Sequence, residues 1–196
     1  MTEASSAGPT RARVHERDTR ADAVRETAAQ HAPKHGRLIR SARDGRLLSA
    51  LMLPFFLIRP PAGYGVLRTT GRRTGKARRK CVRVIRRGER AYIVQLRPPE
   101  MALVRPSAVA AWVWNIRANA DVTLRIRGGT FAGVARELED ASELELARQA
   151  ICETVNLFDY GECALHLRGL PSRAKINELH RFWFDTGVPL EVELHR

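Results

Sequence analysis

Residues 65–87 read GVLRTTGRRTGKARRKCVRVIRR, and they say more about the fold than any other stretch of the chain. The first part, Gly65–Thr70, is typical of a short strand, and residues 71–76 form a glycine-containing turn. From Arg79 to Arg87 the side chains alternate, which is the pattern of a strand with one solvated face. The stretch therefore predicts two antiparallel strands joined by a tight and strongly basic turn.

Alternating strands continue outward from this hairpin. Gly88-Glu89 predicts a second turn, and Gly128-Gly129 is a strong two-residue hairpin signal. The further strands are expected at Ala91–Leu96, Asp121–Arg127, Thr130–Leu138 and Val188–Leu194.

Helices are expected between and around these strands, where the apolar residues recur every three or four positions. They are predicted at Arg37–Leu57, Ser107–Ala118, Ser142–Val155 and Pro171–Phe184. Antiparallel strands with a few flanking helices predict an α+β fold built on a small, mainly antiparallel barrel.

The first 35 residues differ from the rest, because their apolar positions are almost all alanine. Such a segment buries little surface to offset the entropy of ordering it. We therefore expect residues 1–35 to form a mobile N-terminal arm, with a frayed helix at Asp18–Gln30. Residues 36–196 are expected to form a single domain.

The charge is distributed unevenly along the chain of 196 residues, whose formal net charge is +13. Residues 68–90 hold eleven basic residues and one acid, whereas residues 137–196 hold six basic and twelve acidic residues. A basic sector of this kind attracts polyanions or a phosphorylated or carboxylated small molecule. The three cysteines and six histidines show no metal-ligand spacing, so no metal site is expected.

The one long apolar run, Ala50–Ile58, is interrupted by Pro54 and is too short to span a bilayer, which needs about 20 residues. The run suits a buried core segment, a cover over an active-site mouth, or a contact with an anionic membrane. The odd number of unpaired cysteines and the absence of a signal-like apolar region favour a cytoplasmic protein. Peripheral membrane association stays open because basic residues precede the run.

The turn combines three kinds of residue suited to binding an anion. Gly71 and Gly75 let the backbone approach a ligand and expose N–H groups. Threonines supply hydroxyl donors, and arginines can fork onto phosphate or carboxylate. A solvated hairpin is the alternative, and the spacing does not match a P-loop. The cofactor-binding candidates here are Thr69, Thr70, Gly71, Arg72, Arg73, Thr74, Gly75, Lys76 and Arg78.

A second element is the segment WVWNIRANA, residues 112–120. Trp112 and Asn115 lie three residues apart, so a helix places an aromatic surface and an amide on neighbouring parts of one face. An indole can stack on a planar ring, and an amide can bind ring heteroatoms. The alternative is that the tryptophans belong to the core and that Asn115 is a local cap.

Residues 65–76 together with Trp112-x-x-Asn115-Ile116-x-Ala118-Asn119 resemble the deazaflavin-dependent nitroreductase and quinone reductase family. The resemblance covers about residues 38–138, with a looser match at Val188–Leu194. It implies a split β-barrel that binds coenzyme F-420, a deazaflavin with a phosphodiester and an oligoglutamate tail. By position, the basic residues of the turn would meet phosphate and carboxylates, and Trp112 and Asn115 would line the deazaflavin groove.

The chain departs from the family pattern at several positions. The family usually has Ser/Lys-Gly-Gly where this chain has Leu96-Arg97-Pro98-Pro99, and the two prolines remove two N–H donors. Arg97 takes the place of the basic residue and is a further cofactor-binding candidate. Ala120 stands in place of the usual proline. The segment Leu157–Leu170 differs from the family's tyrosine-rich substrate helix, and Tyr160 in it is the catalytic candidate, as a proton donor.

The resemblance implies an oxidoreductase that transfers a hydride from reduced F-420 to a small hydrophobic acceptor of quinone, nitro or enone type. The alternatives are FMN as the coenzyme, or a non-catalytic split-barrel protein that carries a hydrophobic ligand. A nucleic-acid-binding module is disfavoured, because residues 68–90 hold no aromatic residue for stacking on bases. A homodimer is a further expectation, since sheet-edge dimers are common for this fold.

Overall fold

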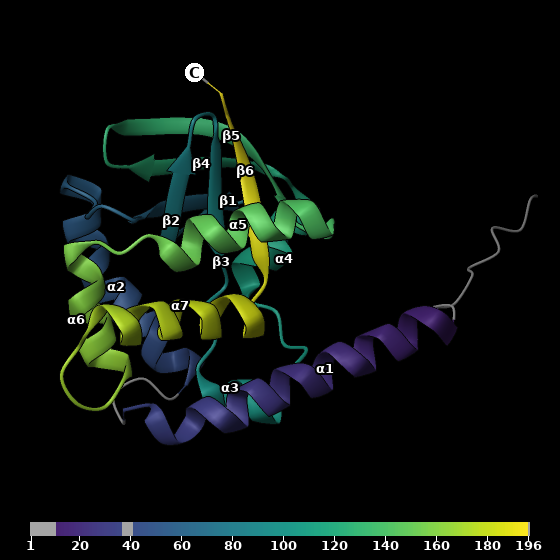
Figure 1. The fold of residues 1–196 in the computed structure, drawn as a ribbon. Helices are drawn as coiled ribbons and strands as arrows, with labels where there is room; N and C mark the ends of the chain where they lie inside the picture. The colour runs from purple at the N-terminus through teal and green to yellow at the C-terminus, as the bar shows by residue number, and fades with distance from the viewer. Residues whose placement is uncertain (1–10, 37–40, 196) are drawn as a thin grey trace, which may run out of the picture.

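The computed structural model describes residues 11–36 and 41–195, with side chains from Asp18 onward apart from Ala42 (Figure 1). Six antiparallel strands close into a barrel in the order β1-β2-β3-β6-β5-β4. The strands are β1 (Tyr64–Thr70), β2 (Ala77–Arg87), β3 (Arg90–Val94), β4 (Asp121–Ile126), β5 (Gly129–Glu137) and β6 (Pro189–His195). The predicted fold class, a mainly antiparallel barrel with flanking helices, is confirmed.

The register of the strands shows how the two hairpins and the last strand close the barrel. Thr70 pairs with Ala77 across the basic turn, and Ile126 pairs with Gly129 across the second hairpin. The last strand, β6, pairs with β3 on one side and β5 on the other. The C-terminal strand therefore joins β3 to β5, and the direct pairing of β1 with β4 closes the barrel.

Seven α-helices flank the barrel in the part of the chain that the structure describes, and a short 3₁₀ turn, Ala32–Lys34, follows the first. They are α1 (Arg11–His31), α2 (Ala42–Ile58), α3 (Pro99–Val104), α4 (Ala111–Ala118), α5 (Ala141–Glu153), α6 (Leu157–His166) and α7 (Arg173–Thr186). Figure 1 shows α5 and α7 side by side along the barrel, with α1 beyond α7 and next to α3.

Two main cores result from this arrangement. The barrel interior packs strand side chains such as Leu67, Ile93 and Leu124, and α4 adds Val113 and Ile116 to this cluster. The second core lies between the outer barrel wall and α1, α5, α6 and α7. Because α4 packs into the barrel cluster, its residues Trp112 and Asn115 are held in a fixed position relative to the barrel.

The N-terminal segment, expected to be an arm with a frayed helix at Asp18–Gln30, forms a longer helix in the described residues. Residues 11–31 form α1, and Ala21, Val24 and Ala28 on its inner face are buried. These small side chains recur at intervals of three and four, so they let the helix pack closely against its neighbours although each buries little surface. Residues 1–10 lie outside the described residues.

The loop after β3 also differs from the expectation of one helix at Ser107–Ala118. The observed α4 begins at Ala111, and the sequence analysis missed α3. Pro98 is the N-cap of α3 and Pro99 is its first residue, where a proline's missing N–H costs no helical hydrogen bond. Because α3 packs against α1, the departure from the family pattern coincides with the place where the N-terminal helix docks.

The outer face of β2 is covered, whereas the alternation of residues 79–87 predicted that it would be solvated. Arg83 and Ile85 on that face are fully buried, and helices α2 and α5 pack against the strand. The prediction of a solvated face is wrong, because strand periodicity does not reveal which helices from later in the chain will cover it.

Candidate functional site

The basic turn is closed by its own backbone. Gly71 N donates to Lys76 O over 2.9 Å, and the N–H groups of Thr74 and Gly75 both donate to Gly71 O, over 3.1 and 2.8 Å. Gly75 has a φ of 64°, in the left-handed region that favours glycine. A Cβ on Gly71 would lie 3.0 Å from Lys76 O, so this position is also tight. The sequence thus encodes one defined shape for the turn.

Asn115 on α4 holds the turn in place. Its side-chain Oδ1 accepts from Arg72 N over 3.1 Å, and its Nδ2 donates to Thr69 Oγ1 over 3.1 Å. Asn115 and Thr69 are both buried. The amide therefore uses its oxygen and its nitrogen within the protein, which makes Asn115 a positioning residue for the turn.

The exposed aromatic surface beside the turn belongs to Trp114, which the sequence analysis did not choose. The guanidinium carbons of Arg72 and Arg117 lie 5.4 and 4.5 Å from the centroid of its ring, in cation–π range. Trp112, the tryptophan predicted from the sequence to line the cofactor groove, is half-buried and packs against the barrel core. Helix α4 thus contacts the turn twice, through Asn115 and through Trp114.

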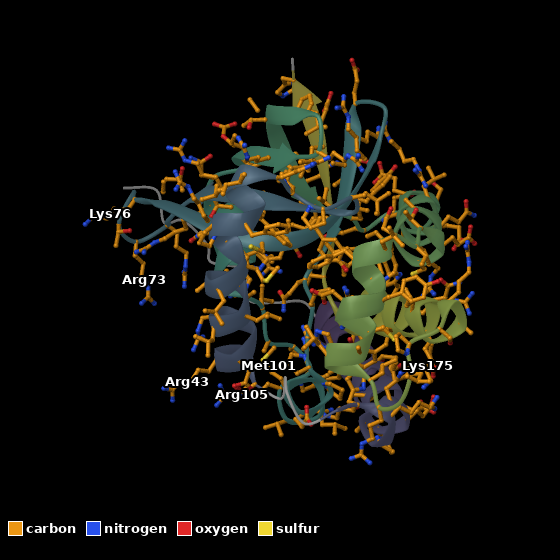
Figure 2. The ribbon with its side chains drawn as sticks, turned by 90° about the vertical axis from the view of Figure 1, so that its left-hand side faces the viewer. Arg43, Arg73, Lys76, Met101, Arg105 and Lys175 are labelled. Carbon is orange, nitrogen blue, oxygen red and sulfur yellow. The ribbon has the colours of Figure 1, made fainter. Side chains whose placement is uncertain are left out.

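The remaining cations of the turn point into solvent. Arg73, Lys76, Arg78 and Arg79 are exposed, and no hydrogen bond or ion pair joins their side chains to another described residue. Figure 2 shows Arg73 and Lys76 projecting outward. Arg78 crosses the turn, since its Nε lies 3.4 Å from the position of a Cβ on Gly71. Positive charge that no protein carboxylate neutralises is available to an external anion.

An open surface hollow of about 380 Å³ adjoins the turn. It extends from the end of β1 to the neighbouring strands β4 and β5. Its lining includes Thr69, Thr70 and Gly75, three of the residues chosen from the sequence, and also Arg68 and Asp121. The turn, its hydroxyl groups and an open cavity therefore lie together.

Two predicted site residues lie apart from the turn. Arg97 is buried, and its guanidinium donates to Pro106 O and, over 2.6 Å, to Ala108 O. Burial lowers its pKa from 12.5 to about 10. These contacts tie down the loop between α3 and α4. Tyr160 is exposed on α6, and no described contact joins it to the turn.

A buried polar cluster lies on the outer face of β2, and the sequence analysis missed it. Arg83 Nη1 lies 2.5 Å from Asp159 Oδ1, with both side chains 0% exposed. Tyr64 donates from its hydroxyl to the same carboxylate oxygen over 2.7 Å. Arg83 Nη2 lies 3.2 Å from His180 Nδ1. An arginine between Cys81 and Ile85 on one strand face was the available signal, because an arginine is rarely fully buried unless it is paired.

The cluster also joins three helices to the barrel. Arg83 Nη2 donates to Ile151 O over 3.1 Å and to Thr154 O over 2.7 Å, at the end of α5. Burial, followed by the charge of Arg83, lowers the pKa of His180 to about 3. Burial raises the pKa of Tyr64 well above its usual value. Without solvent access this cluster is structural rather than a ligand site.

Two further findings concern metal binding and membrane spanning by the described residues. Among residues 11–36 and 41–195, no three His, Cys, Asp or Glu side chains are arranged to hold a metal ion. Within the same ranges, none of the helices has the length and apolar character needed to span a membrane.

The closed antiparallel barrel with its flanking helices defines a protein of the split-barrel class. The family model described as F420H(2)-dependent quinone reductase matches residues 60–164, and the chain belongs to this family. The predicted family is confirmed. The protein is accordingly an F-420-dependent oxidoreductase, and its cofactor is coenzyme F-420.

Solved structures are similar at low sequence identity. An F420-H2 dependent reductase is 18% identical, with 67% of this chain and 95% of that chain covered and a TM-score of 0.40. A conserved hypothetical protein from Mycobacterium tuberculosis is 14% identical, with 76% of this chain and 81% of that chain covered and a TM-score of 0.45. No curated protein sequence matches the chain. The expected cytoplasmic location and homodimer stay predictions.

Proposed function

We propose that the protein binds reduced F-420 at the turn of residues 69–79 and reduces a hydrophobic acceptor of the quinone type. This proposal rests on the exposed turn cations that pair with no described side chain, next to a cavity lined by Thr69 and Thr70. F-420 carries a phosphodiester and several carboxylates, so the donor set of the turn fits the charge of the coenzyme.

The proposed roles divide between residues that bind and residues that position. Arg73, Lys76 and Arg78 bind phosphate and tail carboxylates through charged hydrogen bonds, which are stronger than neutral ones. Asn115 and Trp114 position the turn and Arg72 through the contacts described above. The Thr70 hydroxyl is a further donor to the coenzyme at the cavity wall.

When bound, reduced F-420 supplies the hydride for the reaction. The protein's own residues need to hold the coenzyme and the acceptor within reach of each other, at about 3–3.5 Å between reacting atoms, and to exclude water. The family description supports a quinone as the acceptor. Nitro and enone compounds are the other acceptor types that the resemblance implies.

The acceptor is tested with the purified full chain and reduced F-420. A soluble quinone, a nitroaromatic compound and a cyclic enone are compared by the rate at which the reduced coenzyme is oxidised. We expect kcat/KM for the quinone to exceed the other two by about tenfold or more. Equal values for the nitro compound would contradict the quinone assignment, and no oxidation with any acceptor would contradict the proposed activity as a whole.

A further inference from the structure

Helix α2 has two chemically different faces. Its inner face packs Phe56, Met52 and Leu53 against β1 and α6, in a cluster with Tyr64 and Phe158. Two hydrogen bonds fix the helix to β2, from Lys80 Nζ to Gly45 O over 3.0 Å and from Cys81 N to Ser49 Oγ over 3.1 Å. The inner face is therefore part of the fold.

The outer face carries an apolar stripe that nothing in the described chain covers. Its members recur every three or four residues, as one face of a helix requires. They are between 52 and 80% exposed, although each is large and hydrophobic. The α2 stripe consists of Leu47, Leu51, Phe55 and Ile58. Contiguous apolar side chains on a surface of this kind mark an interaction site rather than ordinary surface.

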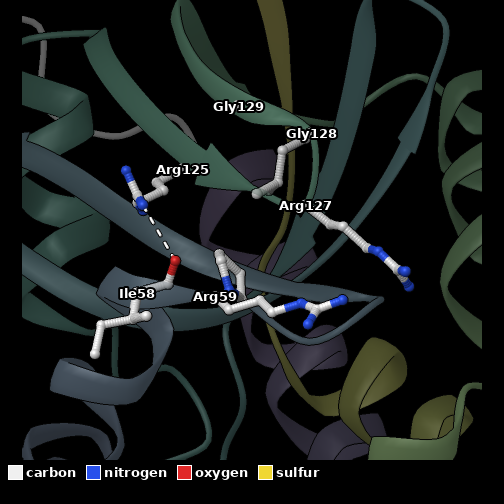
Figure 3. Close-up of a pocket in the computed structure, with 8 residues that line it drawn as sticks. Ile58, Arg59, Arg125, Arg127, Gly128 and Gly129 are labelled. Atoms are coloured by element: carbon white, nitrogen blue, oxygen red, sulfur yellow. Dashed lines mark hydrogen bonds between the residues drawn. The ribbon is translucent and has the colours of Figure 1, made fainter.

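Arginines border the end of the stripe (Figure 3). A shallow pocket of about 250 Å³ lies between Ile58–Pro60 and the β4–β5 hairpin. Arg125 folds back and donates from Nη2 to Ile58 O over 3.3 Å, which fixes the helix end to β4. Arg59 and Arg127, the arginine pair, are exposed and extend to the same side of the pocket in Figure 3.

The arginine pair has no carboxylate to neutralise it among the described residues. No acidic residue lines the pocket, and no hydrogen bond or ion pair joins either guanidinium to another described side chain. At the opposite end of α2, Arg43 and Arg46 are also exposed. Asp44 between them caps the helix together with Ser41. Cations thus border the α2 stripe at both ends.

We propose that the α2 stripe and the arginine pair dock this protein on an anionic phospholipid surface. The four apolar side chains enter the boundary of the acyl chains, and Arg59 and Arg127 bind lipid phosphates. The charge around the stripe selects this occupant, because stable surface docking takes apolar area and basic residues together. The proposal goes beyond the reductase function and does not depend on it. Within the run Ala50–Ile58, the side chains on the inner face of α2 belong to the core, and those on the outer face contact the lipid in this proposal.

The test measures sedimentation of the full-length protein with vesicles of phosphatidylglycerol and of phosphatidylcholine. We expect binding to phosphatidylglycerol that weakens as the ionic strength rises, and little binding to phosphatidylcholine. The variant Arg59→Gln/Arg127→Gln should bind about 25-fold more weakly, at about fivefold for each arginine near an anionic surface. The variant Leu51→Ser/Phe55→Ser should lose about tenfold or more.

Matched controls separate this surface from general charge and hydrophobicity. Arg173→Gln/Arg181→Gln removes two exposed cations of α7, and Leu146→Ser/Leu170→Ser removes two exposed leucines elsewhere. Both controls should bind vesicles as the unchanged protein does. Circular dichroism shows whether each variant is folded, and reduction of a water-soluble acceptor should be the same in all four.

Three results would overturn the proposal. Equal loss in the controls would show that binding is non-specific. Binding of inorganic phosphate or glycerol phosphate that depends on Arg59 and Arg127, without vesicle binding, would make the pocket a site for a soluble anion. A dimer that Leu51→Ser/Phe55→Ser dissociates, again without vesicle binding, would make the α2 stripe an interface between two copies of the chain.

Discussion

Strand β2 carries the same residue type in opposite settings at its start and at its middle. Near its start, Arg78 and Arg79 are exposed, and no described side chain pairs with them. Five residues further along, Arg83 is fully buried and contacts Asp159, His180 and two backbone carbonyl groups. One strand thus contributes both to the proposed coenzyme site and to the structural centre of the helical layer.

Burial and the available partners decide what each of these arginines does. The charge of Arg83 is neutralised by Asp159 and both of its Nη groups are used, so Arg83 is committed to the fold. An exposed arginine without a carboxylate partner contributes little to stability and leaves its charge for a ligand. We therefore expect changes at Arg83 to affect unfolding, and changes at Arg78 to affect binding.

The largest effect is expected from breaking the buried ion pair. Asp159→Asn removes the negative charge that neutralises Arg83, and losing one partner of a buried pair costs about 3–5 kcal/mol. Urea unfolding should show this loss in the free energy of unfolding. The double variant Arg83→Met/Asp159→Leu should recover much of the stability, because no unpaired charge remains. A loss below about 1 kcal/mol in Asp159→Asn would contradict a structural role for the pair.

Acid should destabilise the protein through His180, whose folded pKa is about 3 against 6.5 in the unfolded chain. Above pH 6.5 the histidine is neutral in both states, so it adds no pH dependence. As the pH falls below 6.5, the unfolded state binds a proton that the folded state does not bind until about pH 3. The free energy of unfolding should therefore decrease across this window.

The variant His180→Gln isolates this contribution, since glutamine does not titrate and its side-chain oxygen can still accept from Arg83. Stability measured by urea unfolding should fall less steeply in the variant between pH 6.5 and about 4.5. Carboxylates such as Glu143 and Glu178, whose pKa values are lowered by Arg136 and Lys34, titrate in both proteins and cancel in the comparison. Parallel curves would show that His180 is not the cause.

A smaller effect is expected where the turn meets α4. Asn115→Ala leaves Arg72 N and Thr69 Oγ1 without the amide that joins them. We expect a stability loss of about 1–2 kcal/mol and about a three- to tenfold weaker affinity for F-420, with the charge of the turn unchanged. An unchanged affinity in a destabilised variant would mean that the turn keeps its shape without Asn115.

The smallest effect is expected at Tyr160. Its side chain is exposed on α6, and no described hydrogen bond, ion pair or ring contact joins it to the turn, so Tyr160→Phe should change kcat by less than about twofold. The pH profile of kcat should also stay the same. A tenfold decrease in kcat with an unchanged affinity for F-420 would instead support the predicted role of its hydroxyl as a proton donor.

The sequence predicted the turn and the strands because their signals are local. The glycines of the turn and the alternation of β1, β4 and β5 lie within short windows, where turn chemistry and strand period decide the structure. The observed bounds differ from the predicted ones by only a few residues, as for β1 at Tyr64–Thr70. Family membership followed from the same local motifs.

The buried cluster could not be predicted, because its partners come from distant parts of the chain. Asp159 is in α6 and His180 is in α7, and neither lies in a motif that points to Arg83. The low hydrophobic content of the N-terminal segment also gave no sign that α1 packs against the rest of the protein. Its alanines pack closely although each buries little surface. Trp114 was missed because the helical spacing from Asn115 favoured Trp112. The Trp112 side chain instead packs against the barrel core.

The most direct test of the account is a titration with F-420 that compares the two ends of β2. Arg73→Gln/Arg78→Gln removes two free cations of the turn, and Arg86→Gln/Arg87→Gln removes the same charge from the far end of the strand. We predict that the first variant binds F-420 at least about tenfold more weakly, since charged hydrogen bonds contribute about 1.5–3 kcal/mol each, and that the second binds as the unchanged protein does. Unchanged binding in the folded first variant, or equal weakening in both, would contradict the turn as the coenzyme site.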